Sequence, residues 1–152
     1  MRALKTILII LFSLIGLWLV LSLFGPKEVQ VERSTVVNAK SETIYAYVSH
    51  LKNQDEWGVW RRMDKDARFE FTGVDGTVGA RASWDGDTVM QGSQTITALE
   101  PGKSVTSELA FGKFMVSQVS LDLEAVDAGT SVTWSLHGTI PFHYRAMMLF
   151  MG

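Results

Sequence analysis

The chain of 152 residues contains no cysteine, which excludes disulfide frameworks, thiolate metal sites and cysteine nucleophiles together. This absence is compatible with an oxidising periplasm. The sequence also has no P-loop, no nucleophile-elbow pattern and no His-x-His or His-Glu-x-x-His spacing. Its three histidines, His50, His137 and His143, are interpreted as surface or strand-edge residues. The sequence therefore predicts no catalytic residue, no metal site and no cofactor.

Basic residues are scarce outside the amino terminus. Residues 26–152 carry 12 Lys and Arg against 16 Asp and Glu, a net charge of −4. Arg61 and Arg62 form a pair rather than a patch, and no basic stripe reverses the sign locally. Such a surface repels nucleic acid and anionic lipid head groups. A nucleic-acid partner is therefore not expected.

A long hydrophobic run opens the chain. Ile7 to Phe24 is a stretch of 18 residues without a charge, and as a helix it spans roughly 27 Å, the thickness of a bilayer core. Because Arg2 and Lys5 precede it, the positive-inside rule places the amino terminus in the cytoplasm. We therefore expect a single-pass protein of the inner, cytoplasmic membrane with a periplasmic soluble part.

A cleaved signal peptide is the alternative for this run. Its apolar region is usually about 7 to 15 residues long and ends in a small-x-small site, whereas Val20-Leu21-Ser22 offers only a poor one. An uncleaved anchor is therefore favoured. The resulting division is an anchor over residues 1–25 and one domain over residues 26–152, large enough to bury a single core.

Hydrophobic periodicity orders the domain. A strand is predicted from Val29 to Ala39, then a helix that buries Ile44, Tyr45, Val48 and Leu51, then a short helix from Asn53 to Asp64. Alternating segments joined by short turns follow, which is typical of an antiparallel meander. These segments are Arg68–Thr72, Val78–Trp84, Met90–Leu99, Lys103–Phe111, Lys113–Val126 and Thr130–Ile140, and a final helix starts in Tyr144–Met151.

The stretch from Asn53 to Asp64 is the most informative. Trp57 and Trp60 are three residues apart and share one face of the predicted helix, so both indoles can point into one concavity of the sheet. Each large aromatic residue alone is more often ordinary core. Together they favour an apolar cavity with few polar groups. The predicted lining residues are Trp57, Trp60, Phe69, Phe71, Trp84, Gln94 and Trp134.

The order of elements and several short motifs resemble the helix-grip superfamily that includes START domains, Bet v 1 allergens and polyketide cyclases, often labelled SRPBCC. The matching pieces are Val31–Ala39, Val48–Asp64, Val78-Gly79-Ala80 leading to Trp84, and Thr133-Trp134-Ser135. The chain looks closest to bacterial members with one amino-terminal transmembrane helix. The resemblance implies an α+β fold, a curved antiparallel sheet with two short helices and a long carboxy-terminal helix. Only the start of that helix is visible here, so we expect either a fragment or a cavity open along one side.

These observations predict membrane-tethered binding of a hydrophobic small molecule or lipid. The resemblance also implies an alternative, a polyketide cyclase or dehydratase that uses His137 or a pocket carboxylate. Alternation, however, places His137 on the strand face opposite Trp134. A membrane-bound interaction or stress-sensing module, with an unidentified protein partner, is a second alternative.

Overall fold

The computed structural model describes residues 2–112 and 115–150. These residues form two compact units: the described parts of Met1–Val29 and Thr139–Gly152 make a helical unit, and Gln30–Gly138 make a sheet unit. The predicted strand start at Lys113 and helix end at Met151 lie outside the described residues.

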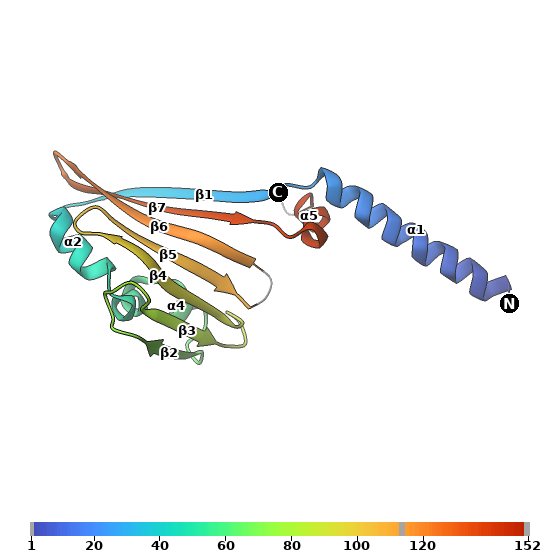
Figure 1. Cartoon of the computed structure of the whole chain (residues 1–152), viewed down its shortest axis with the longest axis horizontal. Coiled ribbons are helices and arrows are strands. Elements are labelled where there is room, and N and C mark those ends of the chain that lie inside the picture. The colour runs from blue at the N-terminus through green and yellow to red at the C-terminus, as the bar shows by residue number, and fades with distance from the viewer. Residues whose placement is uncertain (1, 113–114, 151–152) are drawn as a thin grey trace. The chain divides into compact units, whose positions relative to one another are not determined.

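A curved antiparallel sheet of seven strands dominates the sheet unit (Figure 1), in the order β1-β7-β6-β5-β4-β3-β2. Apart from the interval between β1 and β2, sequence neighbours lie side by side, as expected for a meander. The α+β helix-grip architecture predicted from the sequence is confirmed. The elements are β1 (Glu28–Val37), α2 (Ser41–Val48), the 3-10 helix η1 (Leu51–Asn53), α3 (Gln54–Trp57), α4 (Trp60–Met63), β2 (Arg68–Thr72), β3 (Arg81–Asp85), β4 (Gly92–Glu100), β5 (Ser104–Phe111), β6 (Met115–Val126) and β7 (Gly129–Thr139).

Alternation along the strands builds the core face of the sheet. Leu121 pairs with Trp134 and Val119 with Leu136 across β6 and β7, while Ser107 on β5 pairs with Val119. Ile44 and Val48 of α2 pack on this face in one cluster with Leu121 and Leu123. Burial of these apolar side chains holds the helices against the sheet.

Two aspartates anchor the helical strap (residues 51–64) that crosses the sheet. At its start, Asp75 in the β2–β3 turn accepts hydrogen bonds from the backbone N–H groups of Leu51 (2.7 Å) and Lys52 (3.3 Å). At its end, Asp64 accepts one from the N–H of Thr88 at 2.9 Å. This bond lowers the pKa of the Asp64 carboxyl, because it favours the charged form. Both ends of the strap are thereby tied to hairpin turns of the sheet.

The strap is not the single helix that the sequence predicted. It breaks at Gly58, whose extended backbone (ψ 156°) separates α3 from α4, while its N–H closes α3 on the Gln54 carbonyl at 2.6 Å. A β-carbon at Gly58 would lie 2.5 Å from that carbonyl oxygen, so the close approach requires glycine. The prediction of one continuous helix from Asn53 to Asp64 was wrong in this respect.

Two predicted strands begin later than expected. β3 starts at Arg81 because Gly79 has a φ of 91°, and the Ala80 N–H closes a turn on the Thr77 carbonyl. β4 starts at Gly92 because Met90 has a φ of 54°. Left-handed backbone of this kind interrupts a strand.

The helical unit contains α1 (Arg2–Phe24) and α5 (Phe142–Met148). Over Leu4–Phe24, α1 is long enough and apolar enough to cross a membrane. A signal sequence can have the same length and composition. α5 packs against α1: the Trp18 indole donates a hydrogen bond to the His143 carbonyl at 3.1 Å, and a methyl at Gly25 would collide with the Arg145 carbonyl. α5 therefore contacts the end of α1.

Candidate ligand cavity

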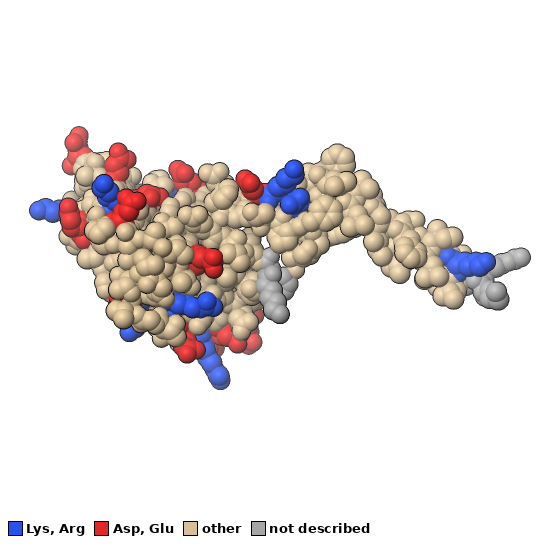
Figure 2. Space-filling model, viewed as in Figure 1, with Lys and Arg blue, Asp and Glu red and all other residues tan. Residues whose placement is uncertain are grey.

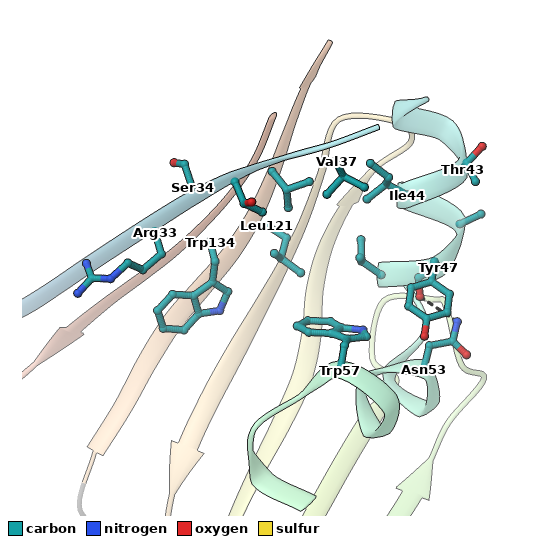
Figure 3. A pocket seen from close by; sticks show the side chains of 14 residues that line it. Arg33, Ser34, Val37, Thr43, Ile44, Tyr47, Asn53, Trp57, Leu121 and Trp134 are labelled. Carbon is teal, nitrogen blue, oxygen red and sulfur yellow. Dashed lines mark hydrogen bonds between the residues drawn. The ribbon is translucent and has the colours of Figure 1, made fainter. Parts of the chain in front are cut away.

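A cavity of about 800 Å³ lies between α2, α3 and the β1–β7–β6 part of the sheet. Figure 3 shows Trp57 on α3 and Trp134 on its strand lying across the cavity from each other, with Leu121 on the sheet between them. The residues that line it are Arg33, Ser34, Thr35, Val37, Thr43, Ile44, Ala46, Tyr47, Val48, Asn53, Trp57, Leu121, Val132 and Trp134. Its walls are therefore mostly apolar.

A second cavity of about 300 Å³ lies under the strap. It shares Trp57, Leu121 and Trp134 with the larger one, so the two adjoin along these side chains. Its remaining lining residues are Gln54, Gly58, Val59, Trp60, Gln94, Leu109 and Val119. Both volumes fall at the scale of small-molecule sites, about 300 to 1,000 Å³.

Trp57 and Trp60 have different environments despite their spacing. Trp60 stacks on Trp84, with ring centroids 5.5 Å apart and planes at 15°, and meets Phe111 edge-on at 5.3 Å. Trp57 keeps 38% of its surface exposed although it lines both cavities. An exposed indole beside an apolar hollow presents a large contact area to a ligand.

The structure divides the seven predicted lining residues into two groups. Trp57, Trp60, Gln94 and Trp134 line the smaller cavity together. Phe69, Phe71 and Trp84 line neither cavity and belong to packed core. Trp84 is 3% exposed and packs with Phe69 among other apolar residues, and Phe71 packs against the cluster that contains Leu51 and Ile96.

Phe69 and Trp84 also border a separate groove of about 640 Å³. Charged residues such as Arg68, Glu70 and Glu108 line this groove as well. Its mixed polar lining sets it apart from the two apolar cavities.

Few polar groups face the two cavities. Gln94 is partly buried in the smaller one, and no other described residue hydrogen-bonds its side-chain amide. The titratable residues among the described lining are Arg33 and Tyr47. Arg33 folds back along its own strand and donates to the Glu32 carbonyl at 2.7 Å.

Tyr47 ties α2 to α3 at the edge of the larger cavity. Its hydroxyl donates to Glu56 Oε2 at 2.6 Å, which raises the pKa of the Tyr47 phenol because the bond needs its proton. The Asn53 amide donates to the Tyr47 carbonyl at 2.9 Å (Figure 3), so Asn53 makes no side-chain cap on α3. These two bonds fix the spacing of the helices beside the cavity.

The histidines lie apart from the cavities. His137 is exposed on the face of β7 opposite Trp134 and pairs with exposed Gln118, in agreement with the alternation. His50 packs on Gly76, and its Nδ1 lies 3.0 Å from the Ala46 carbonyl. His143 belongs to the helical unit. Within the described residues, no three His, Asp or Glu side chains are grouped so as to hold a metal.

Sequence reasoning missed part of the lining. It assigned Val37, Leu109, Val119 and Leu121 to strands without placing them at a cavity, and it did not single out Tyr47. The spacing could have indicated Tyr47, because it follows the buried Ile44 by three residues and so lies on the same side of the helix.

The fold and cavities define a helix-grip α+β protein with an apolar pocket. Residues 28–150 match the family described as "Polyketide cyclase / dehydrase and lipid transport", and the chain belongs to this family. No protein among curated sequences matches it significantly.

Solved structures share the fold at low sequence identity. Truncated norcoclaurine synthase from Thalictrum flavum has a TM-score of 0.63 at 10% identity, over 82% of this chain and 84% of that one. The ginseng major latex-like protein 151 from Panax ginseng has 0.55 at 15% identity, over 82% and 92%. The di-domain ARO/CYC protein StfQ of the steffimycin biosynthetic pathway has 0.56 at 14%, over 76% and 38%.

Proposed function

We propose that this protein binds a hydrophobic small molecule or lipid in the two adjoining cavities while α1 tethers it to a membrane. The observation that carries the proposal is Trp57, a half-exposed indole shared by two apolar cavities. A contiguous apolar hollow that is open to water marks a ligand-binding groove or an interaction site. The family description, which includes lipid transport, agrees with such a ligand.

The ligand class follows from the few polar groups. Trp57, Trp134 and Leu121 offer contact to an apolar body. Gln94 offers one amide, which both donates and accepts hydrogen bonds. An amphiphile with one carboxyl, hydroxyl or carbonyl group, such as a fatty acid, would satisfy Gln94 and fill the apolar space.

The orientation of α1 across the membrane follows from its flanking charges. α1 has the length of a membrane span, and Arg2 and Lys5 are the only charged residues before or within its apolar run. We place the amino terminus in the cytoplasm and the sheet unit outside it, in an inner membrane.

The proposal is tested with full-length protein in detergent micelles and a brominated fatty acid that quenches tryptophan emission on contact. Trp18 of α1 is first replaced by phenylalanine, so that emission comes from the sheet unit alone. We expect saturable quenching. Trp57→Ala should weaken the affinity about 10- to 100-fold, the equivalent of roughly 1.5 to 3 kcal/mol of lost apolar burial.

Met63→Ala is the matched control, since Met63 is an exposed apolar residue of the same strap that lines neither cavity. Equal affinity of both variants, or quenching that does not saturate, would contradict the proposal. Turnover of a bound polyketide-like ligand that is lost in Tyr47→Phe would instead favour the cyclase or dehydratase alternative, because Tyr47 is a proton-carrying group at the cavity.

A further inference from the structure

The carboxy-terminal segment (residues 142–150) exposes several large apolar side chains. Phe142, Met147, Leu149 and Phe150 are all exposed, Phe150 to 74%. Between them lie the aromatic, basic and histidine side chains of His143, Tyr144 and Arg145. A short segment that combines exposed apolar residues with Tyr and Arg is typical of a membrane–water interface.

The partner of this surface is indicated by α1. Apolar side chains cover α1 all round, and no charged residue follows Lys5 within it. On the face shown in Figure 2, the helix is uncharged between its two ends, whereas Lys, Arg, Asp and Glu are interspersed over the sheet unit. The exposed surface of residues 142–150 thus continues the lipid-facing surface of α1.

Close packing fixes the depth of α5 on α1. Ser22 and Ala146 are fully buried, and the Arg145 backbone lies against Gly25. Small residues of this kind allow the backbones of two helices to approach. The Trp18 indole donates a hydrogen bond to the His143 carbonyl, so α5 contacts the chain from Trp18 to Gly25, a rise of about 10 Å at the end of α1.

The length of this contact along α1 is close to the depth to which interfacial helices insert into a bilayer. Their apolar faces are buried about 5 to 10 Å into the boundary between head groups and acyl chains. With Gly25 at the membrane surface, the His143 backbone beside Trp18 lies on the membrane side of that surface. Arg145 and Lys27, at the same end of the unit, lie at the level of the lipid phosphates, where cations are favoured.

We propose that residues 142–150 form a second membrane contact, an interfacial segment inserted in the outer leaflet beside α1. The inference rests on the proposed membrane tether. It assigns the lipid bilayer, and no protein, as the partner of this segment.

The absence of cysteine makes a direct test available. Single cysteines at Met147, Phe150, Leu11 and Val74 are spin-labelled in the full-length protein, which is reconstituted in phosphatidylcholine vesicles. Collision rates of each label with oxygen, which concentrates in lipid, and with a water-soluble nickel chelate then give its depth. All four side chains are exposed, so labelling should leave the fold intact.

Leu11, in the middle of α1, reports on the tether, and Val74, in the β2–β3 turn and 71% exposed, is the aqueous control. We expect the labels at Met147 and Phe150 to lie about 5 to 10 Å below the lipid phosphates, and Leu11 deeper. Labels at Met147 and Phe150 as open to nickel as Val74, with Leu11 in lipid, would overturn the inference and leave the tether standing. Low collision rates with both reagents would show that protein covers the segment and would also overturn it. A water-exposed Leu11 would reject the tether and the inference together.

Discussion

At Gly92 the packed aromatic core leaves no room for a side chain. It pairs with Trp84 across β3 and β4, and a methyl group there would collide with the Cζ2, Cε2 and Nε1 atoms of the Trp84 indole. That indole is held by Trp60, stacked at 5.5 Å, by Phe69 at 6.2 Å and by Phe111 at 6.3 Å. Gly92→Ala therefore requires the ring and its neighbours to shift.

Overpacking of a filled core typically costs about 1 to 3 kcal/mol, and we expect Gly92→Ala to lower the free energy of unfolding by this amount. For a domain near 100 residues, each kcal/mol shifts the melting temperature by about 4 to 8 °C. Unfolding is followed by near-ultraviolet circular dichroism of the full chain in detergent. Because Trp60 lines the smaller cavity, ligand affinity should fall as well.

Trp84→Phe combined with Gly92→Ala separates steric overlap from any effect on the strand backbone. The smaller ring leaves space for the methyl group, so the two changes together should be less destabilising than their sum, by about 0.5 to 3 kcal/mol. Two outcomes would show that the Trp84 ring is not tightly packed against Gly92. One is strict additivity of the two changes in unfolding free energy, and the other is a Gly92→Ala variant within about 0.5 kcal/mol of wild type.

Trp84→Ala should destabilise the protein by about 3 to 5 kcal/mol, whereas Trp57→Ala should leave its melting temperature nearly unchanged; similar losses would show that Trp57 is core. Because the pKa of Asp64 is lowered in the folded protein by the Thr88 bond, its contribution to stability is complete above the unfolded pKa and is lost as the pH falls through the folded pKa. Urea titrations below pH 5 should therefore show a steeper loss in wild type than in Asp64→Asn, and parallel curves would argue against that role. Tyr47→Phe removes the bond between α2 and α3, so stopped-flow quenching should show faster ligand entry and exit, and unchanged rates would show that this bond does not limit access to the cavity. A reporter fused after Gly152 should behave as periplasmic, and release of a soluble species that starts between Ser22 and Pro26 would identify a signal peptide instead.

Much of the fold could be predicted because alternation and turn chemistry are local. The meander β2–β7 is joined by turns such as Pro101-Gly102 and Asp127-Ala128-Gly129, whose residue types mark chain reversal. The break at Gly58 was missed because glycine inside a helical pattern is tolerated in many helices. Here tertiary contacts, among them the anchors at Asp75 and Asp64, set the path of the strap.

The cavity was predictable in character but not in detail. Aromatic composition indicated an apolar interior, yet it could not say that Trp84 stacks on Trp60 while Trp57 stays half-exposed. That difference depends on the turn of the backbone at Gly58. Likewise, the contact of α5 with α1 depends on a hydrogen bond between residues 18 and 143, far apart in sequence, which no local pattern reports.

If the two adjoining cavities hold an amphiphile, that molecule should be detected by mass spectrometry of the purified protein. Full-length protein is isolated from membranes in a mild detergent beside the double variant Trp57→Ala/Gln94→Ala, which removes the shared indole and the polar anchor, and beside Met63→Ala. We expect a lipid or fatty acid to be enriched on wild type and on Met63→Ala, and depleted on the double variant. The same lipid profile on all three proteins would contradict it.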